Sequence, residues 1–168
     1  MGLAVVVMGV QGSGKSTVGA ELASRLGVDF VDGDDLHPPR NKQRMAAGIP
    51  LDDADRAPWL REVGEVLARE FDRGVVVACS ALKRRYRDAI RDREADVYFV
   101  ELWGPIEIVA ARIAARNHAF MPATLLASQY EALESLAPDE NGVRVSLEQE
   151  SGAVVDEALR AIRANVSR

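Results

Sequence analysis

A glycine-rich segment near the amino terminus has the residue types that bind a phosphate. Residues 9–16 read Gly-Val-Gln-Gly-Ser-Gly-Lys-Ser and match the pattern G-x-x-x-x-G-K-S/T at every position. Such a loop turns successive backbone N–H groups and the start of the next helix toward negative charge. Lys15 would reach the β- and γ-phosphates, and the Ser16 hydroxyl is a hard oxygen ligand for Mg²⁺. The segment therefore predicts a site for a nucleoside triphosphate and Mg²⁺. Its expected contacts are Gly9, Val10, Gln11, Gly12, Ser13, Gly14, Lys15, Ser16 and Thr17.

An acidic segment follows about twenty residues later. Asp32, Asp34 and Asp35 come directly after a short apolar run. A phosphoryl acceptor needs a group that orients its hydroxyl and takes its proton, and Asp34 is the candidate for that base. Asp32 could hold Mg²⁺ through a water molecule. The alternative is an acidic turn that only caps the next segment.

Cationic side chains could bind an anionic acceptor. Lys83 and Arg87 lie four residues apart on an expected helix and would share a face near a strand end. The alternative for this basic stretch is a solvated helix face. His37 lies in a loop before two prolines and is a further candidate for the acceptor site, although a lone loop histidine is often only a surface residue.

Two arginines precede an irregular stretch at 117–122. Arg112 and Arg116 share a helix face. Arginines beside a loop that closes can neutralise phosphate charge, so both are expected at the ATP site, with Arg116 acting in catalysis. The alternative is a surface helix with salt bridges.

Buried strands alternating with helices must position these residues. Continuous Val-rich runs predict strands, and apolar residues at helical spacing predict helices. The expected strands are 3–8, 28–31, 75–79, 97–102 and 143–147. The expected helices are 16–26, 40–47, 56–72 (capped by Asp55), 81–93, 105–116, 123–136 and 152–164. This alternation predicts an α/β fold with a parallel sheet covered on both sides, and ligands at the carboxyl ends of its strands.

Composition sets limits on the protein class. The 168 residues carry 21 Lys+Arg and 26 Asp+Glu, a formal net charge of −5, with 48% apolar residues. This suits a single folded domain, 1–168, and argues against a general nucleic-acid binder. One cysteine excludes an internal disulfide and a cysteine metal cluster. The early apolar run is far shorter than the ~20 residues of a membrane helix, so no membrane contact and a cytoplasmic location are expected.

Other classes with the same phosphate loop fit less well. A guanine-reading N-K-x-D segment is absent from the expected place, and no transporter-type L-S-G-G-Q run exists. These absences favour a small-molecule kinase. Remaining alternatives are a nucleotide-binding regulatory module with little catalysis, and a nucleic-acid kinase, which the acidic charge disfavours.

Several segments together resemble the gluconokinase family, within the shikimate- and nucleotide-kinase-like kinases. Beyond the phosphate loop, the most specific are Asp32-Gly-Asp-Asp-Leu-His-Pro38 and Cys79-Ser-Ala-Leu-Lys83. Others are residues 48–51, 55–56, 58–60, 86–88, 128–129, 133–134 and 138–140, so that the resemblance spans nearly the whole chain.

The resemblance implies a fold and an activity. It implies a three-layer α/β/α kinase fold, a five-stranded parallel sheet in the order 2-3-1-4-5, a short helical lid at about 112–124 and a homodimer. The implied reaction is transfer of the ATP γ-phosphoryl to the 6-hydroxyl of D-gluconate with Mg²⁺. Lys15 and Ser16 would serve ATP–Mg²⁺, Arg112 and Arg116 would be lid arginines, and Asp34, His37, Lys83 and Arg87 would bind the sugar acid. A related kinase for another small acid or a nucleoside monophosphate is the alternative.

Overall fold

Five parallel strands form one sheet in the computed structural model, which describes residues 2–116 and 123–168. The strands are β1 (Ala4–Met8), β2 (Asp29–Asp32), β3 (Val75–Ala78), β4 (Tyr98–Trp103) and β5 (Gly142–Ser146). Their order is β2-β3-β1-β4-β5, which confirms the expected topology. β1 lies at the centre, where Val6 is in register with Val77 on one side and Phe99 on the other.

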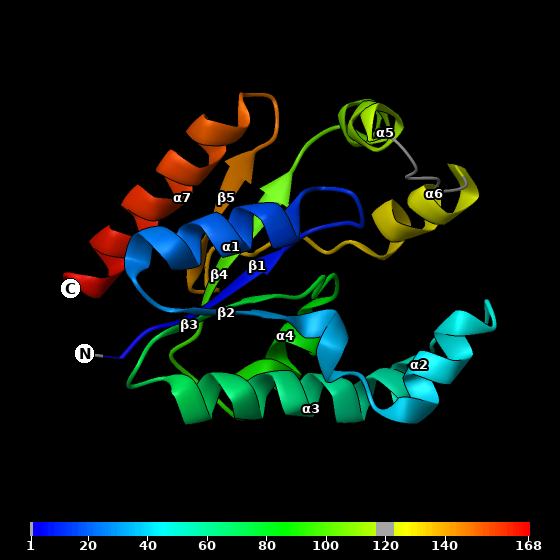
Figure 1. The fold of residues 1–168 in the computed structure, drawn as a ribbon, viewed down its shortest axis with the longest axis horizontal. Coiled ribbons are helices and arrows are strands. Elements are labelled where there is room, and N and C mark those ends of the chain that lie inside the picture. Colours follow the sequence, from blue (N-terminus) through cyan, green and yellow to red (C-terminus); the bar gives the residue numbers. More distant parts are fainter. Residues whose placement is uncertain (1, 117–122) are drawn as a thin grey trace.

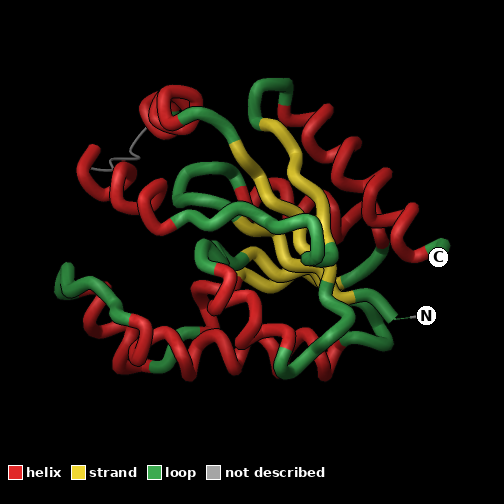
Figure 2. Tube along the Cα trace, turned by 180° about the vertical axis from the view of Figure 1, so that it is seen from behind, coloured by secondary structure: helices red, strands yellow, loops and turns green. Residues whose placement is uncertain are grey.

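Helices cover both faces of the sheet (Figures 1 and 2). α1 (Lys15–Leu26), α5 (Ile106–Ala115) and α7 (Ser151–Val166) pack on one face, and α3 (Asp53–Glu70) and α4 (Arg84–Arg91) on the other. Side chains of β1 alternate between the two cores, with Val5 and Val7 in one and Val6 and Met8 in the other. The Val-rich runs are therefore buried on both faces, and the predicted three-layer fold is confirmed.

Three shorter elements lie near the carboxyl ends of the strands. They are the 3₁₀ helix η1 (Gly33–Leu36), α2 (Pro39–Ala46) and α6 (Ala123–Ala132). Figure 1 shows α2 and α6 at the end of the molecule where the loop after β1 lies. The expected lid at about 112–124 includes residues 117–122, which lie outside the described residues.

Three helix boundaries differ from the prediction by three residues or more. α3 begins at Asp53, because Asp52 rather than Asp55 is its N-cap: Asp52 accepts from the Asp55 amide at 2.7 Å and Asp55 accepts from the Asp52 amide at 3.1 Å. α4 begins at Arg84, three residues later than expected, since Ala81 adopts φ 45° and cannot continue a helix. α6 ends at Ala132 instead of residue 136.

Candidate active site

The glycine-rich loop joins β1 to α1 as the sequence predicts. Gly9 has φ 148°, and a Cβ there would lie 2.8 Å from the carbonyl oxygen of Leu102. Gly14 precedes α1 with φ 92°, a left-handed conformation that side chains rarely adopt. The loop can therefore turn tightly and present the amino end of α1 to a phosphate.

A cavity of about 160 Å³ lies against this loop. It is lined by Gln11, Gly12, Gly14, Lys15, Ser16, Thr17, Asp32, Asp34, Ala78 and Arg116. The structure thus brings together residues from the loop, the end of β2 and the end of α5. Burial lowers the pKa of Lys15, and the nearby carboxylate of Asp34 partly opposes that effect. The Lys15 ammonium also donates to the carbonyl of Val10 at 3.1 Å.

Ser16 and Asp32 form the part of this cavity that suits a divalent cation. The Ser16 hydroxyl lies 3.4 Å from Asp32 Oδ2 and donates to it. In the described ranges, no group of three or more His, Cys, Asp or Glu side chains could hold a metal by itself. A hydroxyl and one carboxylate fit Mg²⁺, which takes few protein ligands and completes its shell with water and substrate phosphates.

Asp32 also has the capping role considered as the alternative. Its Oδ1 accepts from the amide of Asp34 at 3.0 Å and begins η1. Partial burial raises the pKa of Asp34, and the negative charge of Asp32 raises it further, while Lys15 opposes the shift. A carboxylate with a raised pKa accepts a proton more readily, which suits a general base.

His37 lies beside this acidic turn in a buried position. Its ring stacks on Trp59 with centroids 4.1 Å apart and planes at 16°. The indole of Trp59 donates to the carbonyl of Gly33 at 2.7 Å, and Asn41 Nδ2 lies 3.2 Å from His37 Nδ1. Burial, followed by the charges of Arg56 and Lys42, lowers the pKa of His37 to about 4, so its ring is neutral at pH 7. His37 can therefore hydrogen-bond a hydroxyl but cannot supply positive charge.

Two further cationic side chains lie over the Tyr86 ring, and neither is among the residues that line the phosphate cavity. The ammonium of Lys83 lies 5.7 Å from the ring centroid and the guanidinium of Arg56 lies 5.6 Å from it. The sequence prediction named Lys83 but missed Arg56, which is half-buried and donates to the carbonyl of Leu51 at 2.6 Å. The Asp52–Asp55 capping box, which fixes the first turn of α3 just before Arg56, is the sequence signal that could have found it.

Arg87 does not take the place predicted for it. Its side chain is 0% exposed and pairs with the equally buried Glu140, with Nε–Oε1 at 2.7 Å and Nη2–Oε2 at 3.0 Å. Its Nη1 donates to the carbonyls of Ala81 and Leu82 at 2.8 and 3.3 Å. The prediction that Arg87 binds substrate is therefore corrected: the fully buried Arg87 bonds to Glu140 and to backbone carbonyls, and it shares no exposed surface with Lys83.

Arg112 and Arg116, the two arginines expected in a lid, line the same hollow. Arg112 donates to the carbonyls of Leu147 and Gln149 at 2.9 and 3.4 Å, which ties α5 to the segment after β5. With Arg116 it borders a second hollow of about 320 Å³, which shares Gly14, Thr17 and Arg116 with the phosphate cavity.

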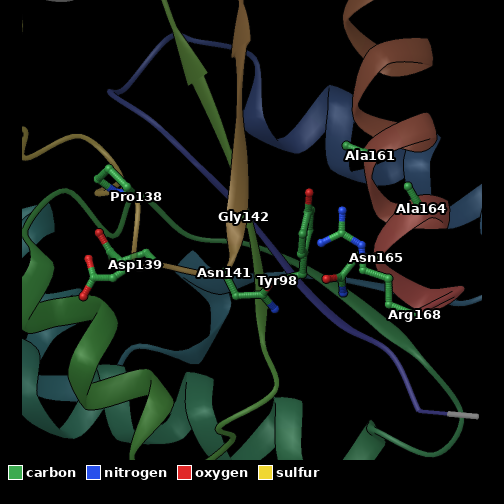
Figure 3. A pocket seen from close by; sticks show the side chains of 10 residues that line it. Tyr98, Pro138, Asp139, Asn141, Gly142, Ala161, Ala164, Asn165 and Arg168 are labelled. Carbon is green, nitrogen blue, oxygen red and sulfur yellow. The ribbon is translucent and has the colours of Figure 1, made fainter.

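A hollow of about 560 Å³ lies elsewhere and is not part of this site (Figure 3). It borders Tyr98 and Gly142, the first residues of β4 and β5. It therefore lies at the amino ends of the strands, away from the phosphate loop, whereas ligands of such sheets bind at the carboxyl ends.

Comparison with known proteins identifies the family. A family model described as shikimate kinase matches residues 11–163. The chain is 41% identical to the thermosensitive gluconokinase of Escherichia coli strain K12 (97% of this chain and 89% of the relative), and 44% identical to the gluconokinase of Gluconobacter oxydans (95% and 91%). The chain belongs to the gluconokinase family. A crystal structure of a gluconokinase from Sinorhizobium meliloti superposes with a TM-score of 0.85 at 44% identity, covering 99% of this chain and 92% of that one.

The wider shikimate kinase fold is also evident. Shikimate kinase from Aquifex aeolicus superposes with a TM-score of 0.63 at 20% identity, over 98% of both chains, so that gluconokinases and shikimate kinases share this architecture. Within the described ranges no helix is both long and apolar enough to cross a membrane. The segments that suggested the gluconokinase family, 32–38 and 79–83, lie at the carboxyl ends of β2 and β3, beside the phosphate loop.

Proposed function

We propose that this chain transfers the γ-phosphoryl group of ATP to the 6-hydroxyl of D-gluconate, giving 6-phospho-D-gluconate and ADP. The observation that carries this function is the common cavity that Lys15, Asp32 and Asp34 line against the phosphate loop of a gluconokinase-family fold. In this cavity Lys15 can bind phosphate oxygens, Asp32 can help to hold a metal ion, and Asp34 can take the proton of the acceptor.

The chemical step follows from these positions. The 6-hydroxyl oxygen forms a bond to the γ-phosphorus while the bond from that phosphorus to the β–γ bridging oxygen breaks, and ADP leaves with the electron pair. Asp34 takes the hydroxyl proton, while Lys15 and Arg116 neutralise charge on the phosphate oxygens. Ser16 would hold Mg²⁺ directly and Asp32 through water, and a bound Mg²⁺ would neutralise phosphate charge.

The acceptor side suits an anionic polyol. Neutral His37 offers hydrogen bonds to hydroxyls, whereas Lys83 and Arg56 supply positive charge for a carboxylate. A nucleotide that spans the two adjoining hollows would place its base and ribose near Arg112.

An acceptor panel tests this function. The purified protein is given ATP–Mg²⁺ with D-gluconate, shikimate, other sugar acids or nucleoside monophosphates, and ADP release is followed. We expect gluconate to give the highest kcat/KM. A higher value with shikimate would favour the second candidate, which the shikimate kinase family model suggests. Nucleotide binding without acceptor-dependent turnover would instead indicate a regulatory module.

Two further expectations belong to this proposal. The chain would act in the cytoplasm as a homodimer, on small molecules and not on nucleic acid or membranes. Light scattering of the purified protein tests the dimer, and cell fractionation tests the location.

A further inference from the structure

The loop between β3 and α4, residues 80–83, is held in a conformation that it would not adopt alone. Ala81 has φ 45°, the single positive φ among the non-glycine residues that the structure describes. A side chain in this region is strained, and such strain persists only where surrounding contacts impose it. Lys83, proposed above to face the acceptor, ends this loop as the N-cap of α4.

Backbone contacts hold the loop from several directions. The carbonyl of Ser80 accepts from the amide of Gly9 at 3.2 Å, so the loop is bonded directly to the phosphate loop. The carbonyl of Leu82 accepts from the amide of Glu134 at 2.7 Å. Arg87 Nη1 donates to the carbonyls of Ala81 and Leu82. The peptides on both sides of the strained residue are therefore fixed.

Glu134 contacts the residue that follows Lys83 in the chain. Its Oε1 accepts from the amide of Arg84, the first residue of α4, at 2.8 Å. The Lys83 side chain makes no capping bond to its own helix, and Glu134 instead supplies an acceptor for one of the unpaired amides of the first turn of α4. Glu134 thus holds the peptide that follows Lys83 through its side chain and the peptide that precedes Lys83 through its amide.

The segment that carries Glu134 also contacts the phosphate loop. It follows α6, where Oε1 of Gln129 accepts from the amide of Gln11 at 3.2 Å. Beyond Glu134, Asp139 pairs with Arg84 at 2.6 Å and Glu140 holds Arg87. Residues 129–140 therefore connect the phosphate loop with the acceptor loop on one continuous stretch of chain.

We propose that Glu134 is a positioning residue for phosphoryl transfer, acting through Lys83. It fixes the peptides on either side of Lys83 and so keeps the ammonium in place for the carboxylate of the acceptor. This inference rests on the proposed function. Glu134 is exposed and contributes one side-chain hydrogen bond, so its loss should loosen the loop without unfolding the protein.

Steady-state kinetics with single variants give the first test. In Glu134→Ala we expect KM for gluconate to rise about 5- to 10-fold, the effect of one lost hydrogen bond, while KM for ATP stays within about 2-fold. Glu134→Gln keeps an oxygen acceptor and should restore most of the loss. Glu131→Ala, an exposed change on α6, is the matched control and should behave as the unchanged protein.

A double-mutant cycle tests whether Glu134 acts through Lys83. Lys83→Met alone should raise KM for gluconate, and adding Glu134→Ala to it should raise KM no further. Three results would each overturn the inference. The first is that the double variant raises KM for gluconate by the product of the two single effects. The others are that Glu134→Ala raises KM for ATP as much as KM for gluconate, or that Glu134→Gln has a KM for gluconate as high as that of Glu134→Ala. Failure of the proposed function is a separate result, in which the unchanged protein prefers another acceptor. The double-mutant cycle is then measured as KM for that acceptor, and the same three results would overturn the role of Glu134.

Discussion

Replacing Glu140 by Gln should destabilise the protein in a way that depends on pH. The Glu140 side chain is 1% exposed and receives hydrogen bonds from Arg87, Arg91 and the amide of Ala137. Burial alone would raise the pKa of this carboxyl, but the hydrogen bonds, of which Arg87 gives the strongest, lower it from 4.5 to about 2. The folded state therefore favours the ionised form.

The size of the effect follows from this shift. A change from 4.5 to about 2 corresponds to about 3 kcal/mol of unfolding free energy. Breaking a buried ion pair costs about 3–5 kcal/mol, because the remaining charge stays buried without its partner. The two routes agree, so we expect Glu140→Gln to lower the free energy of unfolding by about 3 kcal/mol at pH 7.

The sign of the pH dependence is fixed by the direction of the shift. The folded-state pKa is depressed, so this stability is complete above the unfolded value of 4.5 and is lost as pH falls toward about 2. Gln resembles the protonated carboxyl, so the difference between the two proteins should shrink to about 2 kcal/mol near pH 3.5 and vanish below both pKa values.

Urea unfolding followed by circular dichroism measures both quantities. The unchanged protein, Glu140→Gln and the exposed control Glu131→Gln are compared at pH 7 and near pH 3.5. A loss below about 1 kcal/mol at pH 7, or a difference that does not change with pH, would refute the reasoning that the pair with Arg87 stabilises the ionised carboxylate.

Three further predictions concern the site and its surroundings. Asp34→Asn should cut turnover by ~10²-fold or more with ATP affinity retained. The folded-state pKa of Asp34 is raised, so its ionised form destabilises the folded protein as pH rises. The variant should therefore also melt at a higher temperature than the unchanged protein at pH 7. Unchanged turnover would remove Asp34 from the mechanism. Lys15→Ala should abolish most activity without lowering the melting temperature, because burial disfavours the charged form and the Lys15 charge therefore does not stabilise the fold; loss of folding with activity per folded molecule retained would contradict its role. Cys79 is buried and its thiol pKa is raised to about 12, so it should resist alkylation until the protein unfolds, and rapid labelling of the native protein would show that the end of β3 opens.

The phosphate side of the site could be predicted from the sequence because its determinants are local. The loop at 9–16 lies between a strand and a helix whose patterns are plain, so motif and context occur within one short stretch. The strands at 75–78 and 98–103 were also predicted within a residue or so, since short, mainly apolar runs buried on both faces have few alternatives. The strand order was not contained in these patterns and came from the family resemblance.

The proposed acceptor side was harder to predict because its contacts join distant parts of the chain. Helical spacing places Arg87 on the same face as Lys83. It does not reveal that Arg87 pairs with Glu140, because the two residues are 53 positions apart. A similar separation hides the contact at the start of α4, where Glu134, 50 positions from Arg84, accepts from the first amide of the helix. Local patterns predict which residue types a proposed acceptor site needs. Whether a given cationic side chain faces a substrate or pairs within the protein depends on which acidic residue the fold places beside it. A fully buried arginine requires such a partner, and in this protein the partner comes from the segment that also contacts the phosphate loop.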